Sequence, residues 1–428
     1  MAIRFLFSFA LEYKASCKEG GLVMKPAPTL KPATDAAVFS STMTPRLLFA
    51  AAIAFPFLAQ AEPPKATILE TKIISPQLDL YNGWPTVARR ANGELWVSWS
   101  GGRESHVCPF GQVCSMTSRD EGKTWTFPRV LHDSATDDRD SGVLETAKGT
   151  LLVTTFTSLA YEDSFKKATM MAEHTDKGWV SKAMPAERFA RWKAAHERLN
   201  DEERKAELGE WLIRSTDGGK TWSPRIPTVV NSPHGPIQLK DGRLLYLGKQ
   251  LWTGDKKIGA AESKDDGLTW QWLSEIPTRP GDEVPKGLHE LHAVEAADGT
   301  IIAQIRNHNT ANKGETLQSE SKDGGKTWTL PHSIGVWGLP SHLLKRRDGR
   351  LVMTYGHRRP PFGNQARLST DNGQTWSEPI ILSGDGAGGD LGYPSTVELG
   401  DGTLLTVWYE KMKALTHAVL RQATWKLE

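Results

Sequence analysis

The chain has 428 residues, of which 39% are hydrophobic and 24% are charged, as is ordinary for a soluble globular protein. Its formal net charge of +2 gives no indication of a nucleic-acid partner or another polyanion. The length is sufficient for one large domain or two ordinary ones.

The first 61 residues differ from the rest. Segment 43–61, MTPRLLFAAAIAFPFLAQA, has one arginine, an apolar run at 47–58 and Ala-Gln-Ala at its end. This order is typical of a secretory signal peptide, and the apolar run is too short to span a bilayer. We therefore interpret 1–42 as an upstream extension, 43–61 as a signal peptide and 62–428 as the folded domain. The mature protein is expected to be secreted or periplasmic, with no membrane attachment.

Two of the three cysteines, Cys108 and Cys114, follow the predicted leader and lie close together in the chain. Thiols of an exported protein meet oxidising conditions, so the sequence predicts a disulfide between them. The alternative is a pair of free, buried thiols.

An eight-residue phrase, Ser-x-Asp-x-Gly-x-Thr-Trp, occurs five times. The copies begin at Ser118, Ser215, Ser263, Ser321 and Ser369. Ahead of them, a second pattern occurs six times, in which two apolar runs flank a turn that ends in glycine. The six turn glycines are Gly93, Gly149, Gly242, Gly299, Gly349 and Gly402. Apolar runs around such a turn are typical of β-hairpins.

A unit of about 50 residues repeated in this way predicts a β-propeller with four antiparallel strands per blade. The sequence thus predicts an all-β fold with six blades. The final unit lacks the eight-residue phrase, and segment 66–75 is expected to supply its outer strand. In the phrase, Asp and Gly suit a tight turn and Trp suits packing between strands, so we interpret it as structural.

Strand direction separates the two faces of the propeller. The hairpin glycines and the five phrases fall on one face, so a site is expected on the other. The residue nine positions before each turn glycine should lie at the start of an inner strand on that other face. Four of the six residues found in this way suit a sugar site: Trp84, Asp140, Glu290 and Tyr393.

Loops after the second strands add charged groups to the same face. The candidates are Arg103, Glu104, His106, Arg306, Arg358 and Arg359, with His234 close by. Several further histidines fall near this face, but none shows the spacing of metal ligands. The sequence therefore predicts no metal and no cofactor.

The five phrases match the Asp box of the sialidase superfamily, and the chain resembles that family from about residue 72 onwards. The resemblance implies a tyrosine nucleophile at Tyr393 in GYPSTVELGDGTLL, activated by Glu290 in LHELHAVEAADGTIIAQIR. It also implies that Arg306 and either Arg358 or Arg359 bind the substrate carboxylate. By the same resemblance, Arg103 in GGRESH lies beside the site.

Two features depart from the family pattern. Trp84 stands where the family has its first arginine, and no aspartate follows Arg103 where the catalytic acid is expected. Glu104 and His106 are the nearest titratable groups and are the predicted proton donors. Trp84 is expected to stack on a sugar ring, and Asp140 and His234 complete the predicted substrate-binding set.

Blade two carries an insertion at about 184–210 with helical spacing of apolar residues. It is expected on the site face, as a lid, a subsite wall or packing on the rim. The sequence thus predicts a monomeric exo-glycosidase acting on acidic glycan termini, either sialic acid or another carboxylated sugar. Two alternatives stay open: a non-catalytic glycan-binding propeller, and a lyase acting on uronate polymers.

Overall fold

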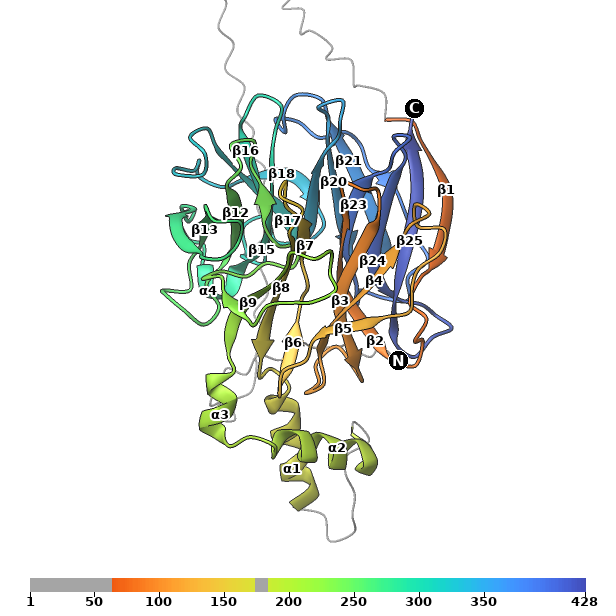
Figure 1. The fold of residues 1–428 in the computed structure, drawn as a ribbon, viewed down its shortest axis with the longest axis vertical. Coiled ribbons are helices and arrows are strands. Elements are labelled where there is room, and N and C mark those ends of the chain that lie inside the picture. The colour runs from red at the N-terminus through yellow and green to blue at the C-terminus, as the bar shows by residue number, and fades with distance from the viewer. Residues whose placement is uncertain (1–63, 174–183) are drawn as a thin grey trace, which may run out of the picture. The chain divides into compact units, whose positions relative to one another are not determined.

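The computed structural model describes residues 64–173 and 184–428 (Figure 1). The predicted upstream extension and signal peptide lie outside these residues. The described chain forms six antiparallel sheets, one for each predicted blade. The innermost strands of neighbouring blades contact one another, as in β2 with β23, β15 with β19 and β19 with β23. The fold is therefore the six-bladed β-propeller that the repeats predict.

The strands follow the chain blade by blade, from the inside to the outside. Blade one consists of β2 (Tyr81–Arg89), β3 (Leu95–Arg103), β4 (Gln112–Ser118) and β5 (Arg129–His132). In blade two, β6 (Asp137–Arg139) and β7 (Val143–Glu145) share the inner position, followed by β8 (Leu151–Ser158), β9 (Gly209–Ser215) and β10 (Ile226–Pro227). Blade three consists of β11 (Ile237–Gln238), β12 (Leu244–Lys249), β13 (Ile258–Ser263) and β14 (Gln271–Glu275).

The remaining blades repeat this order. Blade four consists of β15 (Leu288–Glu295), β16 (Ile301–Asn307), β17 (Glu315–Ser321) and β18 (His332–Trp337). Blade five consists of β19 (Ser341–Lys345), β20 (Leu351–His357), β21 (Gly363–Ser369) and β22 (Ile380–Ile381). Blade six consists of β23 (Leu391–Glu398), β24 (Leu404–Lys411), β25 (Ala418–Leu427) and β1 (Ala66–Ile73). As predicted, the first strand in sequence completes the last blade.

The hairpins and the Asp boxes have the geometry that their residues favour. All six turn glycines have φ between 79° and 89°, a region that side chains rarely adopt. In the box of blade five, the Asp371 carboxylate accepts hydrogen bonds from the Thr375 backbone N–H at 3.0 Å and from its hydroxyl at 2.5 Å. The indole of Trp376 then donates to Gln318 of blade four at 3.0 Å. The box closes its own turn and ties its blade to the preceding one.

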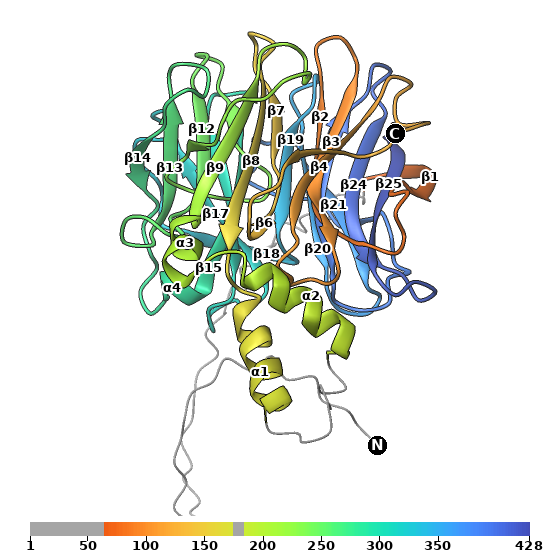
Figure 2. The ribbon, with the colours of Figure 1, turned by 60° about the horizontal axis from the view of Figure 1, so that its bottom comes forward.

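The insertion of blade two contains more helix than the sequence indicated. Helices α1 (Glu162–Glu173), α2 (Ala186–His196) and α3 (Asp201–Ala206) lie between β8 and β9 and gather beyond the ends of those strands (Figure 2). Phe165 of α1 stacks on Phe189 of α2, with ring centroids 5.6 Å apart. Helix α1 was missed because it has few apolar residues and because it lies ahead of the predicted insertion at about 184–210. The described residues contain one further helix, α4 (Val284–Gly287).

The predicted disulfide is wrong, because both cysteines are free and buried. Cys108 packs with Tyr161 and Trp192 beneath the helical insertion. Cys114 belongs to the core between blades one and six, where burial raises the pKa of its thiol to about 12. The two side chains serve different hydrophobic clusters, so closeness in sequence does not bring the sulfur atoms together.

Candidate active site

The four residues chosen by counting back from the turn glycines share an unusual backbone conformation. Trp84, Asp140, Glu290 and Tyr393 have φ of 55°, 50°, 43° and 52°. Each lies at an irregularity where the inner strand has an extra residue relative to its partner strand. A β-bulge of this kind redirects a side chain, and positive φ in residues other than glycine is concentrated at functional sites.

Three of the predicted residues meet in one hydrogen-bonded group. The Tyr393 hydroxyl donates to Glu290 Oε1 at 2.6 Å and accepts from Arg306 Nη1 at 2.8 Å. The same Arg306 nitrogen also donates to Glu290 Oε2. The nucleophile, base and arginine expected from the sequence thus form a closed triangle that joins blades four and six.

The electrostatics of this triangle favour an ionised glutamate beside a neutral phenol. Burial alone would raise the pKa of Glu290, but the Arg306 charge and the hydrogen bonds from Tyr393 and Arg306 lower it to about 2. Burial and the Glu290 charge together raise the pKa of Tyr393 well above its ordinary value. Glu290 is therefore ionised, and it lies within hydrogen-bond distance of the proton that Tyr393 must release when it reacts.

The sequence left open whether Arg358 or Arg359 binds the substrate carboxylate, and the two side chains have different surroundings in the structure. The guanidinium of Arg358 lies 5.4 Å from the centre of the Tyr393 ring, and its buried Nε and Nη2 have no hydrogen-bond partner among the described residues. Arg359 is exposed and stacks on Trp337 at 4.1 Å. Arg358 is thus the arginine that faces the Tyr393 group with unused donors.

Trp84, in place of an arginine, is fully buried and lies against two guanidinium groups. Arg103 lies 5.0 Å from its ring centre and Arg139 lies 4.6 Å from it. Arg103 is itself held by Asp137 through two contacts, of 2.6 and 3.1 Å. Arg139 was missed by the sequence reasoning, although it directly precedes Asp140. Its buried Nε has no hydrogen-bond partner among the described residues.

Glu104 does not join the Tyr393 group. Its carboxylate accepts from Arg191 Nε at 2.7 Å and from Trp192 Nε1 at 3.0 Å, and it pairs with Arg188 at 3.3 Å. All three partners belong to α2, so Glu104 anchors the helical insertion to the loop that follows β3. The insertion therefore lies on the site face, as the strand count predicts.

His106, two residues further on, belongs to a second polar group beside Trp84. Its Nδ1 lies 3.1 Å from Asp390 Oδ1, which also accepts from the hydroxyls of Tyr81 at 2.9 Å and Tyr409 at 3.1 Å. Its ring meets the Trp84 ring edge-on at 5.0 Å. Asp390 was missed, and its place three residues before Tyr393, directly ahead of the inner strand β23, is the signal that could have found it.

His234 lies beneath the site rather than in it. Its ring is 6.5 Å from the Tyr393 ring and packs against His292 at 5.4 Å and His342 at 5.1 Å. We call these three buried residues the histidine layer. Burial lowers the pKa of His234 to about 3, so the layer is uncharged at neutral pH. Within the residues that the structure describes, no group of three or more His, Cys, Asp or Glu side chains is arranged to hold a metal ion.

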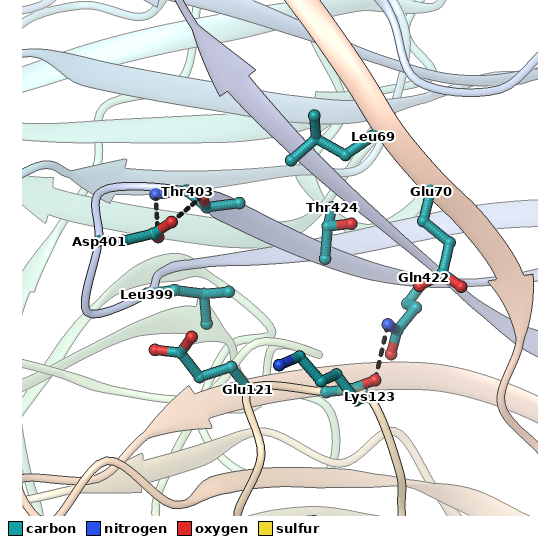
Figure 3. Close-up of a pocket in the computed structure, with 10 residues that line it drawn as sticks. Leu69, Glu70, Glu121, Lys123, Leu399, Asp401, Thr403, Gln422 and Thr424 are labelled. Carbon is teal, nitrogen blue, oxygen red and sulfur yellow. Dashed lines mark hydrogen bonds between the residues drawn. The ribbon is translucent and has the colours of Figure 1, made fainter.

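The opposite face carries a hollow of about 200 Å³ between the Asp box of blade one and the last hairpin (Figure 3). Two of its polar side chains already have partners within the hollow. Asp401 accepts two hydrogen bonds from Thr403, and Gln422 donates to the Gly122 carbonyl. The hollow therefore lies where the first and last blades meet. It offers no convergent set of free polar groups. No helix of residues 64–173 and 184–428 is long and apolar enough to cross a membrane.

Fold and site together define a sialidase-like propeller, with a buried Tyr-Glu-Arg group at the ends of its inner strands. Residues 189–406, about half of the chain, match the family described as BNR repeat-like domain. The chain belongs to this family and is a divergent member of the sialidase superfamily.

Curated relatives include a sialidase of Clostridium perfringens, which is 29% identical over 211 residues, covering 41% of this chain and 55% of the relative. A sialidase of Bacteroides fragilis is 27% identical over 229 residues, covering 47% of this chain and 39% of the relative. A xyloglucanase of Paenibacillus is 28% identical over 206 residues, covering 42% and 19%. This chain thus matches about half or less of the length of these relatives.

Solved structures extend the likeness in fold to most of the chain. A protein of unknown function from Dyadobacter fermentans aligns with a TM-score of 0.67 and 22% identity, covering 85% of this chain and all of that protein. A Hadza microbial sialidase aligns with a TM-score of 0.55 and 18% identity, covering 80% and 65%. At such identities the likeness concerns the fold alone.

Proposed function

We propose that this protein is an exported, exo-acting glycoside hydrolase that releases a carboxylated sugar, sialic acid or a similar acid, from the end of a glycan. The observation that carries the proposal is the Tyr393 hydroxyl held between Glu290 and Arg306. A buried phenol with an ionised carboxylate at 2.6 Å is a nucleophile paired with its base. Export rests on the leader pattern in residues 43–61.

In the proposed reaction, the Tyr393 oxygen attacks the anomeric carbon while its proton passes to Glu290. The glycosidic bond breaks and a covalent glycosyl-tyrosine forms, which water then hydrolyses with retention of configuration. A neutral phenol suits an anionic substrate, because a carboxylate nucleophile would repel it. The low pKa of Glu290 keeps this base ionised in the resting enzyme.

The substrate carboxylate is assigned to Arg306 and Arg358. Arg358 has buried donors without partners next to the Tyr393 ring, as expected of a group that awaits an anion. Trp84 lies 6.3 Å from the Tyr393 ring. Because its side chain is buried and already packs against Arg103 and Arg139, Trp84 shapes the site as a wall rather than as an open stacking platform.

The test is a screen of the purified mature protein against sialosides and uronate-containing oligosaccharides, with product analysis by mass spectrometry. A released acidic monosaccharide that carries one oxygen from labelled water supports the hydrolase. An unsaturated uronate product would identify a lyase instead. Saturable binding of a glycan without turnover would identify a glycan-binding propeller.

A further inference from the structure

Blade two departs from the other blades at its inner strand. The strand is broken into β6 and β7, and Asp140 is the first residue of the break (Figure 1). Both pieces pair with β8, and between Arg139 and Val143 the inner strand has one residue more than β8, where Asp140 takes φ of 50°. This position corresponds to that of Glu290 in blade four and Tyr393 in blade six.

The Asp140 side chain is mostly buried, and its carboxylate has no partner among the described residues. The residue is only 7% exposed, yet among the described residues no hydrogen bond or ion pair reaches its oxygens. A buried carboxyl without a partner is costly unless it is protonated or awaits a ligand. Several charged groups act on it from the surrounding blades: Glu290 from blade four, Arg139 beside it, Arg103 from blade one and Arg306 from blade four.

The proposed hydrolase also needs a group that protonates the leaving oxygen, and the loop after β3 lacks a free one. Glu104 is fully engaged by α2. His106 faces Asp390 through Nδ1, and desolvation together with the Arg139 and Arg103 charges lowers its pKa despite that carboxylate, so the ring is mostly uncharged at neutral pH and is a poor proton donor. Neither group predicted from the sequence therefore suits the role of acid.

We propose that Asp140 is the acid–base residue, a role that the family pattern places in blade one and that this chain has moved to blade two. The inference rests on the proposed function. In the first step, the Asp140 proton passes to the glycosidic oxygen as its bond to the anomeric carbon breaks and the Tyr393 oxygen bonds to that carbon. In the second step, the Asp140 carboxylate takes a proton from water while the water oxygen attacks the same carbon. Tyr393 leaves and regains its proton from Glu290.

The electrostatics agree with these roles. Burial, and then the charge of Glu290, raise the pKa of Asp140 to about 7, against the opposing effect of Arg139, Arg103 and Arg306. Glu290 is held at about 2 in the same site. Two carboxyl groups whose pKa values are separated in this way can act as acid and base at one pH.

The experiment compares Asp140→Asn with wild type on two substrates of the same acidic sugar. One substrate carries an aryl leaving group that needs no protonation, and the other carries a sugar alcohol that does. We expect kcat/KM to fall by about 10²–10⁴-fold for the sugar-linked substrate and by less than 10-fold for formation of the glycosyl-tyrosine from the aryl glycoside. The decline in activity above about pH 7 should disappear in the variant. Equal losses on both substrates would overturn the assignment.

Two further measurements keep the outcome clear. Tyr393→Phe should abolish turnover of both substrates, so a fully active Tyr393→Phe contradicts the proposed function. If Asp140→Asn instead loses activity equally on the two substrates, that result contradicts only the assignment of Asp140 as the acid. If Asp140→Asn fails to fold, Asp140→Glu replaces it. For folded Asp140→Asn, the infrared difference spectrum against wild type near pH 6 should show the carbonyl stretch of a protonated carboxyl, and its absence would overturn the assignment; for Asp140→Glu, the fall of activity at high pH should move to a different pH, and an unchanged pH profile would overturn it.

Discussion

The hydroxyl of Tyr393 and the carboxylate of Glu290 are joined by a hydrogen bond of 2.6 Å across 103 residues of chain. Each comes from the start of an inner strand, in blades six and four, and both use positive φ to reach the same place. Blade five lies between them in sequence, and its inner strand β19 contacts both β15 and β23. The distance between nucleophile and base is therefore fixed by the packing of three blades rather than by a flexible loop.

Replacing Tyr393 with phenylalanine should lower turnover by several powers of ten, because the nucleophilic oxygen is removed while the ring and its packing stay. Binding of the acidic sugar should change by less than tenfold. The measurements are steady-state kinetics and calorimetric titration with the released sugar. Tyr246→Phe is the control, since its hydroxyl bonds to Ser232 and Asn231 and to Thr154 of blade two, and none of these belongs to the Tyr393 group. Turnover that survives in Tyr393→Phe would contradict the nucleophile.

Arg358→Ala should weaken binding of the carboxylated sugar by about 1.5–3 kcal/mol, the usual contribution of hydrogen bonds to a charged group. Arg359→Ala is the matched control, because its guanidinium stacks on Trp337 and its side chain is exposed. We expect Arg359→Ala to change affinity by less than threefold. If the two variants lose affinity equally, the anion site is not the one formed by Arg306 and Arg358.

The histidine layer should make stability depend on pH. Burial lowers the pKa of His234 to about 3 and those of His292 and His342 well below their ordinary value of about 6.5. Between those limits the unfolded chain binds protons that the folded chain excludes. The free energy of unfolding should therefore be highest above pH 6.5 and fall as the pH drops towards 3, by about 1.4 kcal/mol per pH unit for each histidine.

His292→Asn isolates one contribution, because the asparagine oxygen can replace Nδ1 as acceptor of the Leu343 N–H. Urea unfolding between pH 6 and pH 4.5 should give a shallower pH slope for this variant, by about 1.4 kcal/mol per unit. His417→Asn, in the turn before β25, serves as the control. Parallel curves for wild type and His292→Asn would contradict the prediction.

Glu104→Ala should loosen the helical insertion, because the carboxylate is the shared acceptor for Arg188, Arg191 and Trp192. Limited proteolysis should cut within 184–206 faster than in wild type, and the fluorescence of Trp192 should shift to the red as its ring becomes hydrated. Glu197→Ala removes a carboxylate that pairs with Lys193 at the end of α2, and it should change neither readout. A collapse of turnover with α2 still docked would instead make Glu104 the acid.

Thiol titration distinguishes the two states of the cysteines. The unfolded, unreduced domain 62–428 should yield two free thiols, because Cys108 and Cys114 lie in separate hydrophobic clusters. In the folded protein both should react slowly, since both are buried. Finding no thiol after unfolding would restore the disulfide that the sequence suggested.

Much of this architecture could be predicted because it depends on local chemistry. A turn glycine with apolar flanks defines a hairpin, and an Asp box defines a turn, so six blades, their order and the closing strand β1 follow from repetition. The register count reached Asp140, Glu290 and Tyr393 because each inner strand starts at a fixed distance from its hairpin. Local patterns carry that information within a single blade.

What the sequence could not provide were relationships between blades. Whether Glu104 faces a substrate or α2 depends on where the insertion docks. Asp390 likewise has partners from two blades, Tyr81 from blade one and Tyr409 from blade six. The stacking of Arg139 on Trp84 requires the packing of two blades, and the exclusion of the disulfide requires knowing which core each cysteine enters.

The pairing of β1 with β25 also imposes an order on biosynthesis. Ala66 of β1 pairs with Leu427 of β25. Strand β1 is therefore synthesised early but cannot pair until nearly the whole propeller has been synthesised. Until then β1 has an unpaired edge, and blade six is incomplete. Pairing of such remote segments is slow and leaves an edge open to aggregation. Closure of the ring is thus expected to be the last folding event, and a chain that loses residues 66–73 would keep a permanently open seam.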